Sequence, residues 1–179
     1  IITLSKPENK INELWPYIKN QINDGNQIFW VCPLIDQSNS LDFASVKKRF
    51  ETIKKKFPGY VGLLHGALKN EEKEKILLKF LNKEIFILVS TTVIEVGIDF
   101  PNANVIIIEN SNKFGLSQLH QLRGRIGRGS VQGKCILMFK NNLSENAKKR
   151  IKILKDSNNG FIISEEDMKL RGSGDILGF

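Results

Sequence analysis

The chain has 179 residues, of which 41% are hydrophobic and 26% are charged, the usual balance of a globular protein. Its apolar runs are far shorter than the roughly 20 residues of a membrane span, so we expect no membrane protein. The net charge of +8 predicts a phosphate-bearing partner, either a nucleic acid or a nucleotide.

Stretches with helical spacing alternate with apolar runs along the whole chain. The spacing predicts helices at 7–25, 43–57, 70–82, from Leu116 onward and at 144–157. The apolar runs predict strands at 27–35, 60–66, 84–90, 104–110 and 134–140. Pro16 is expected to kink or split the first helix. A capping-box pattern at 164–167 is expected to start a short last helix.

Apolar strands separated mostly by helices favour parallel pairing through right-handed crossovers. We therefore expect an α/β fold, an open parallel sheet covered by helices on both faces. The stretch from Asn158 is expected to form a short C-terminal helical appendage. Ligands of open parallel sheets bind outside the carboxyl ends of the strands. The segments 65–70, 90–99 and 118–129 are thus candidates for a site.

Cys32 and Cys135 lie inside apolar runs without partners at metal-ligand spacing, which predicts buried thiols in a reducing compartment and no metal site. Basic residues gather at 47–56 and at 121–150. For the first run we favour a solvated helix face over an anion site. For the second run we favour a phosphate site, because glycines accompany the charges.

The stretch QLHQLRGRIGRG, residues 118–129, places three arginines among three glycines. If the helix that begins near Leu116 continues, Gln118, Gln121, Arg125 and Arg128 form one polar stripe. Two guanidinium groups that point together suit a polyphosphate, and glycines allow a partner to approach closely. A basic surface helix with a glycine stop is the plainer alternative.

The stretch STTVIEVGID, residues 90–99, follows an apolar strand directly. Hydroxyls and N–H groups of Thr91 and Thr92 could hold a phosphate, Gly97 allows a turn, and Asp99 could accept a hydrogen bond from a sugar. An ordinary strand-turn-helix junction would look similar. A phosphate loop of the GxxxxGK[ST] type is absent from the sequence, so we expect only half of a nucleotide site.

These two stretches resemble motifs V and VI of superfamily 2 helicases, in the second of their two RecA-like motor domains. A larger match is to the RecG family of ATP-dependent DNA helicases, which remodel branched DNA. The segments that resemble this family, in the same order, are 30–36, 62–80, 90–103, 108–129 and 157–178. The resemblance implies a RecA-like domain over 1–157 and, over 158–179, the start of a truncated translocation motif.

The resemblance also implies roles at the nucleotide. Arg125 and Arg128 match the motif VI arginines that reach the ATP phosphates, with Arg128 as the arginine finger, and Gln121 matches the first glutamine of that motif. Gly97 and Asp99 match motif V positions near the nucleotide. ATP and Mg²⁺ would be bound mainly by the first motor domain, which this chain lacks. The isolated chain is therefore expected to be inactive.

Toward DNA, the resemblance implies that Thr91 contacts the nucleic-acid backbone, and we expect contacts also from Thr92, His65 and Arg171. The residues that match the translocation motif are Arg171, Gly172, Gly174 and Asp175. Ser173 departs from the family, which usually has proline there. The implied partners are branched or forked DNA and the N-terminal motor and wedge domains of the same protein. The resemblance also implies that this protein is a monomer of the bacterial cytoplasm. Its implied roles are fork reversal, Holliday-junction processing, recombination and repair.

Two alternatives stay open. The same motor domain occurs in transcription-repair coupling factors, and only upstream sequence separates the two readings. The chain could instead be a non-catalytic nucleic-acid binding module. That module would bind DNA in a strongly salt-dependent way and would tolerate Arg128→Lys, whereas a motor would not, because lysine lacks the planar fork of arginine.

Overall fold

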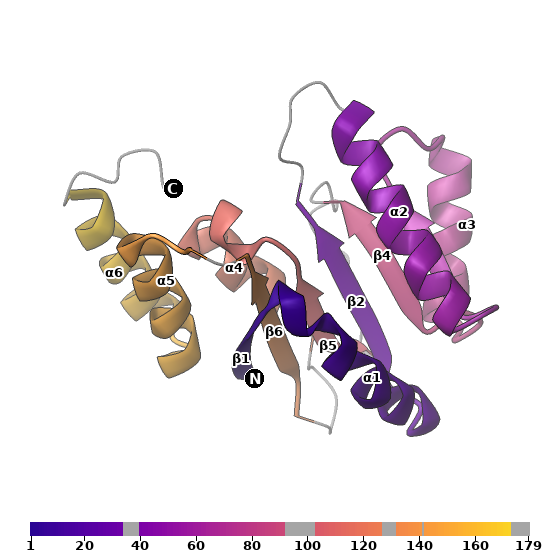
Figure 1. Ribbon diagram of the computed structural model, residues 1–179, viewed down its shortest axis with the longest axis horizontal. Coiled ribbons are helices and arrows are strands. Elements are labelled where there is room, and N and C mark those ends of the chain that lie inside the picture. The colour runs from indigo at the N-terminus through magenta and orange to yellow at the C-terminus, as the bar shows by residue number, and fades with distance from the viewer. Residues whose placement is uncertain (34–39, 92–102, 127–131, 141, 173–179) are drawn as a thin grey trace.

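Figure 1 shows a computed structural model of the chain, which describes residues 1–33, 40–91, 103–126, 132–140 and 142–172, without the side chains of 40–43 and 172. The described strands form one six-stranded sheet in the order β1-β6-β5-β2-β4-β3. Every pairing in it is parallel. The α/β fold with an open parallel sheet, predicted from the apolar runs, is confirmed.

The strands are β1 (Ile2–Pro7), β2 (Gln27–Cys32), β3 (Val61–Leu64), β4 (Ile87–Thr91), β5 (Ala103–Ile108) and β6 (Lys134–Phe139). The α-helices are α1 (Leu14–Asn23), α2 (Ser40–Lys56), α3 (Asn70–Leu81), α4 (Leu116–Arg123), α5 (Glu145–Asp156) and α6 (Gly160–Gly172). Two short 3-10 helices, η1 (Glu8–Glu13) and η2 (Ser111–Lys113), precede α1 and α4.

Two hydrophobic cores lie on opposite faces of the sheet, because successive strand residues point to opposite sides. One core takes Phe29 and Val31 from β2, with apolar residues of α3, α4, α5 and α6. The other takes Ile28 and Trp30 from the same strand, with apolar residues of α1 and α2. Helices therefore cover both faces, as the sequence predicts.

The first strand was not expected, and the predicted helix over 7–25 is wrong in its first part. Residues Ile2–Pro7 form the edge strand β1, paired in register with β6 from Ile2↔Lys134 to Pro7↔Phe139. Only Thr3 of this strand is buried, so no apolar run marks it. The α-helix begins at Leu14, which places Pro16 in the first turn, where its missing N–H would have had no intrahelical acceptor.

The last helix begins five residues earlier than the capping pattern predicts, at Gly160 rather than after Ser164. Asn159 Oδ1 accepts a hydrogen bond from the N–H of Phe161 at 2.9 Å, so the asparagine caps α6 and the segment 164–167 lies inside the helix. Ile163 is 1% exposed and belongs to the same core as α4 and α5. This helix is the predicted C-terminal appendage; the proposed domain boundary at residue 157 stays a prediction.

Within the described part of the chain, none of the helices is long and apolar enough to cross a membrane.

Candidate functional site

The carboxyl ends of the parallel strands bring distant segments of the chain to one edge of the sheet. Thr91 ends β4 and pairs with Cys32, the last residue of β2. Glu109 follows β5 directly, and His65 follows β3. The connection after β2 leads toward β3, whereas the connection after β5 leads toward β6, so the strand order reverses between β2 and β5. Such a reversal is where open α/β sheets bind ligands.

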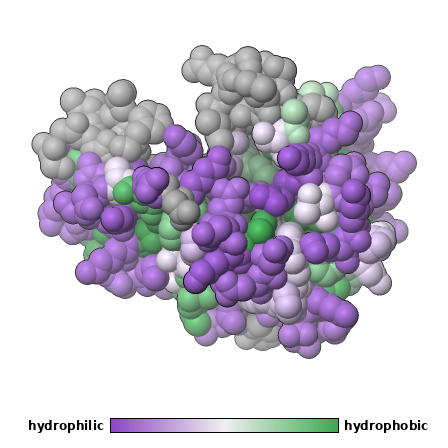
Figure 2. All heavy atoms as spheres, viewed as in Figure 1, coloured by the Kyte–Doolittle hydropathy of each residue, from purple (hydrophilic) through white to green (hydrophobic). Residues whose placement is uncertain are grey.

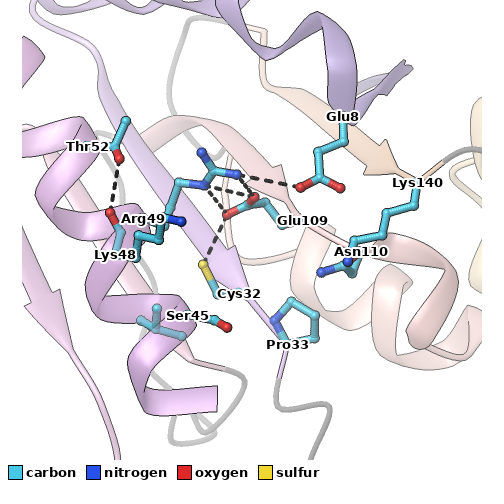
Figure 3. A pocket seen from close by; sticks show the side chains of 11 residues that line it. Glu8, Cys32, Pro33, Ser45, Lys48, Arg49, Thr52, Glu109, Asn110 and Lys140 are labelled. Carbon is cyan, nitrogen blue, oxygen red and sulfur yellow. Dashed lines mark hydrogen bonds and ion pairs between the residues drawn. The ribbon is translucent and has the colours of Figure 1, made fainter. Parts of the chain in front are cut away.

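A pocket of about 300 Å³ lies at this reversal point (Figure 3). Its lining comes from the ends of β2 and β5, from η1, from α2 and from the residue after β6. The residues that line it are Glu8, Cys32, Pro33, Ser45, Val46, Lys48, Arg49, Thr52, Glu109, Asn110 and Lys140. The chain thus has a polar pocket where its topology predicts one.

Glu109 is the centre of the pocket's polar network and is only 6% exposed. Arg49 donates from Nε to both carboxylate oxygens at 3.0 Å, and its Nη2 lies 2.7 Å from Oε1. Trp30 Nε1 donates to Oε2 at 2.7 Å, and the Cys32 thiol donates to the same oxygen at 3.2 Å. Four donor groups from β2 and α2 therefore hold this carboxylate in place.

The guanidinium of Arg49 is consequently committed to carboxylates. Besides Glu109, it faces Glu8 of η1, whose Oε1 lies 3.8 Å from Nη2 (Figure 3). The lysines at the pocket, Lys48 and Lys140, are exposed. An anion that enters the pocket would therefore meet these lysines, because Glu109 already neutralises the arginine.

Both cysteines are buried and unpaired with each other, as the sequence predicts. Burial raises the pKa of the Cys32 thiol, and the neighbouring Glu109 raises it further. Burial also raises the pKa of Cys135 to about 12. Both thiols therefore stay protonated near neutral pH, and the Cys32 thiol serves as a hydrogen-bond donor in the pocket.

The glycine-arginine stretch begins inside α4, which starts at Leu116 as predicted. Gln118 Oε1 accepts a hydrogen bond from the N–H of Gly115 at 3.3 Å, which closes the start of the helix. The helix ends at Arg123, and Gly124 and Arg125 lie in the turn that follows. The predicted polar stripe that continues from Gln121 to Arg125 on one helix face is therefore wrong, because the helix has ended before Arg125.

Arg123 does not face solvent with the rest of the basic run. Its side chain is among the largest fully buried ones, with 2% exposure. Nη1 donates to Thr3 Oγ1 at 3.1 Å and to the carbonyl oxygen of Leu154 at 2.6 Å. Arg150 is also buried, at 4% exposure. Two of the eight basic residues between 121 and 150 are thus part of the interior, which corrects the reading of that run as a single phosphate-binding cluster.

His120 joins Arg123 to the last helix. Arg123 Nη2 lies 3.0 Å from His120 Nδ1, and an arginine can only donate, so this nitrogen accepts. A Cβ at Gly160, the first residue of α6, would stand 3.0 Å from His120 Nε2. Burial and Arg123 lower the pKa of His120, which keeps the imidazole neutral. The glycine therefore lets α6 approach the histidine closely.

Gly124, unlike Gly160, has room for a side chain. A Cβ there would meet its nearest neighbours, the carbonyl oxygens of Gln121 and His120, at 3.5 and 3.6 Å, which is ordinary contact. Its backbone is right-handed, with φ of −70°. The fold alone therefore does not require glycine at this exposed position, beside the half-buried Arg125.

The structure describes some predicted site residues and not others. Gln121 is exposed, and Thr91 is 4% exposed at the end of β4. His65 is half-buried, and its Nδ1 accepts a hydrogen bond from the N–H of Ala67 at 3.2 Å. Arg171 is exposed near the end of α6 and lies 3.1 Å from Asp167. The predicted residues that lie outside the described ones are Thr92, Gly97, Asp99, Arg128, Gly174 and Asp175.

The sequence reasoning missed Arg49 and Glu109. They are 60 residues apart, and neither lies in a motif with fixed spacing. The available signal was the position of Glu109, a lone acid directly after an apolar strand, at the edge where parallel sheets bind ligands. Among the described residues, no group of three or more His, Cys, Asp or Glu side chains could hold a metal ion.

Comparison with known proteins places this geometry in a family. Residues 9–130 match the family model described as the helicase conserved C-terminal domain. The chain is 45% identical to the ATP-dependent DNA helicase RecG of Haemophilus influenzae, over 99% of this chain and 26% of that protein. It is 42% identical to RecG of Escherichia coli K12 over the same shares. The chain thus spans about a quarter of the length of these relatives.

Solved structures agree. The structure of RecG bound to a three-way DNA junction resembles the chain with a TM-score of 0.82 and 41% identity, over 98% of this chain and 23% of that one. Domain 2 of the DEAD-box helicase Mss116p, bound to an RNA duplex, gives a TM-score of 0.58 at 22% identity over 88% and 59%, which supports the RecA-like fold alone. The chain therefore belongs to the helicase conserved C-terminal domain family and, within it, to the RecG type.

Proposed function

We propose that the chain is the second motor domain of an ATP-dependent helicase that moves along branched DNA. The observation that carries the proposal is the match to RecG proteins over nearly the whole chain, at 45% identity in one case. Those relatives are named ATP-dependent DNA helicases, and one related structure holds a three-way DNA junction. In this proposal ATP binds between the chain and a preceding motor domain, and the same protein carries a wedge domain for the junction.

At the nucleotide, the chain supplies positive charge and leaves the binding of ATP and Mg²⁺ mainly to the other motor domain. ATP would supply the phosphoryl group whose transfer drives the motor. Arg128, with Arg125 and Gln121, would approach the phosphates and stabilise the negative charge that develops during transfer. Gly97 and Asp99 would lie near the nucleotide.

The placement of Arg125 supports this role. It follows the end of α4 by two residues, so its backbone leaves a helix whose last residue, Arg123, is buried. A rigid helix end is a good base for a finger that must reach across a cleft, because it reduces the entropy lost on positioning. Gly124, which the fold alone does not require, would give the phosphates or the other domain room to approach.

At DNA, the carboxyl edge of the sheet would contact the sugar-phosphate backbone. Thr91 ends β4 and His65 follows β3 at that edge, and the exposed Lys48 and Lys140 line the pocket there. Thr92, the next residue after Thr91 in the sequence, would contact the same backbone. Contacts of this kind position the protein without reading sequence.

Movement would then pass to the translocation motif through α6. Arg123 bonds the carbonyl oxygen of Leu154 in α5, and His120 packs on Gly160 at the start of α6. A shift of α4 when its arginines engage phosphate would therefore displace α5 and α6. Arg171, Gly172, Gly174 and Asp175 lie at or beyond the end of α6 and would carry that displacement to DNA.

The test is ATP hydrolysis by an intact RecG-type protein that carries this chain, measured with and without forked DNA. We expect Arg128→Ala to reduce DNA-stimulated hydrolysis by about 100-fold or more and to leave fork binding unchanged. Lys149→Ala, which removes one exposed positive charge from α5, serves as the matched control and should retain full activity. Hydrolysis that survives Arg128→Ala and Arg128→Lys would reject the finger and favour a role in binding alone.

A further inference from the structure

The basic helix α5 borders a groove that the motor proposal does not use. The groove has a volume of about 390 Å³ and lies between α5, the edge strand β1 and the end of β6. Its lining residues are Ser5, Phe139, Leu143, Lys148, Ile151, Lys152, Lys155 and Asp156. It opens on the face of the sheet opposite α1 and α2, since Ile151, Phe139 and Leu143 belong to the core on that side.

The groove combines an apolar floor with a row of positive charges. Ile151 is 7% exposed and Phe139 and Leu143 are half-buried, so these three side chains form the floor. Lys148, Lys152 and Lys155 are all exposed and follow one face of α5 at i, i+4 and i+7. In the space-filling view, hydrophobic residues lie among hydrophilic ones over α5 and α6 (Figure 2).

The lysines are only weakly engaged within the chain. Lys148 pairs with Glu145 at 3.4 Å, and both side chains are more than half exposed. Lys155 Nζ lies 3.4 Å from Ser5 Oγ, which is a long hydrogen bond. Asp156 is the one acidic residue in the lining, against three lysines. Exposed pairs of this kind contribute little, so the row keeps its attraction for a negatively charged partner.

The apolar floor decides which anionic partner fits. DNA phosphates would engage the lysines but have no group to place against Phe139, Leu143 and Ile151. An acidic peptide with an apolar side chain satisfies both parts, because its carboxylates meet the lysines and its apolar group fills the groove. The lysine row spans roughly 10 Å along the helix, seven residues at a rise of 1.5 Å, which about three or four residues of an extended peptide would cover.

We propose that this groove, defined by Phe139, Leu143, Ile151 and the three lysines of α5, binds a protein partner through an extended acidic segment that carries an apolar anchor. The proposal does not depend on the motor function, because the groove includes none of the residues assigned to nucleotide or to DNA.

The experiment measures fluorescence anisotropy of a labelled, acetylated and amidated octapeptide, Glu-Asp-Leu-Glu-Glu-Phe-Asp-Ser, with the 179-residue chain and with the intact protein at about 0.1 M salt. We expect saturable binding to both. Lys152→Glu should weaken it about tenfold, whereas Lys149→Glu, an equal charge change on an exposed residue outside the groove, should change it less than about twofold. Replacing Phe and Leu of the peptide by Ala should weaken binding at least about fivefold.

Four results would overturn the proposal. Equal losses from Lys149→Glu and Lys152→Glu would show non-specific attraction to a basic protein. Unchanged binding of the alanine peptide would show that the apolar floor has no role. Displacement of the peptide by a short DNA duplex, with duplex binding itself weakened by Lys152→Glu, would make the row a DNA contact. Binding to the chain but not to the intact protein would show that another part of that protein covers the groove.

Discussion

Two arginines from the two basic runs are stabilised in opposite ways. Arg49 lies in α2 with its guanidinium between the carboxylates of Glu109 and Glu8. Arg123 ends α4 and is more deeply buried, yet its hydrogen bonds go to a threonine hydroxyl, a backbone carbonyl and an imidazole. Among the described residues, no carboxylate forms an ion pair with it. Burial lowers the pKa of Arg123, but a guanidinium still keeps its proton at neutral pH.

A single basic run in a sequence can therefore contain both buried arginines of the interior and exposed lysines of the surface. Arg123 and Arg150 are buried, and Arg123 bonds Thr3 of β1 and Leu154 of α5, whereas Lys148 and Lys149 of the same run are exposed. An arginine can serve the interior without an acid because its five N–H donors can each meet a neutral acceptor. Charge counting alone therefore overstates how much of the run is available to phosphate.

The largest loss of stability should come from removing Glu109, the acid that pairs with Arg49. Glu109→Ala leaves Arg49, Trp30 and Cys32 without their shared acceptor in a buried network. We expect the free energy of unfolding to fall by about 4 kcal/mol, measured by urea denaturation. The signal is tryptophan fluorescence, because Trp30 is bonded to Glu109 and stacks on Trp15 at 5.9 Å.

A double variant sharpens this test. Arg49→Met combined with Glu109→Leu removes both charges and fills the space, so it should cost less than Glu109→Ala alone. If the double variant is less stable than Glu109→Ala, the hydrogen bonds of the network stabilise the fold beyond balancing the charge of Arg49. In that case Arg49 would not be held mainly by its pairing with an acid.

A somewhat smaller loss of stability is expected when Arg123, which has no carboxylate partner among the described residues, is replaced. Arg123→Met keeps the length of the side chain but leaves Thr3 Oγ1 and the carbonyl oxygen of Leu154 buried without this donor. The expected loss is about 3 kcal/mol in the free energy of unfolding. Lys149→Met, at an exposed position of α5, is the control and should be nearly neutral. A loss at Arg123 no larger than the control's would mean that the buried bonds contribute nothing net.

A third, smaller effect is expected in the pH dependence of the free energy of unfolding, and it comes from His120. Burial and Arg123 hold the pKa of His120 below its ordinary value of about 6.5. The unfolded chain therefore takes up a proton near pH 6.5 that the folded chain binds only at lower pH, so stability falls as the pH drops through this window. His120→Gln keeps an acceptor for Arg123 and removes the titration. We expect its stability difference between about pH 7.5 and pH 5.5 to be smaller than that of the wild type; an equal difference would place the acid sensitivity elsewhere.

The smallest effect on stability is expected one residue beyond Arg123. Gly124→Ala fits the described space and backbone, so the free energy of unfolding should change by no more than about 0.5 kcal/mol. Hydrogen–deuterium exchange of α4 should be equally unaffected. In the intact protein, however, a loss of ATP hydrolysis with unchanged stability would show that the glycine serves an approaching partner, and full activity would remove it from the site.

Much of the fold was predictable because its main signals are local. The strands from β2 to β6 are apolar runs, and α3 was predicted to within one residue at each end from its periodicity and its first-turn acids. The start of α6 was wrong because Asn159 caps the helix earlier than Ser164 could, and the buried Ile163 favours the earlier start. Two capping signals lay close together, and tertiary packing decided between them.

The misses share a physical cause, which is dependence on distant parts of the chain. The edge strand β1 has one buried residue and is recognisable only through its pairing with β6, more than 130 residues away. The Arg49–Glu109 pair spans 60 residues, and two acceptors of Arg123 lie 120 residues before it and 31 after it. The motif segments predicted the family, but which arginines are interior and which are exposed depends on contacts that no local pattern encodes.

The pairing of β1 with β6 also has a consequence for synthesis on the ribosome. Of the described strands, β1 is made before all the others and β6 after them, so β1 cannot pair with its neighbour in the sheet until β6 has been made. Until Phe139 has left the exit tunnel, β1 has no partner and β5 presents an open edge. Pairings between distant segments form slowly, and unpaired edges invite association with other chains. A nascent chain that stalls shortly before β6 should therefore be the species most in need of a chaperone.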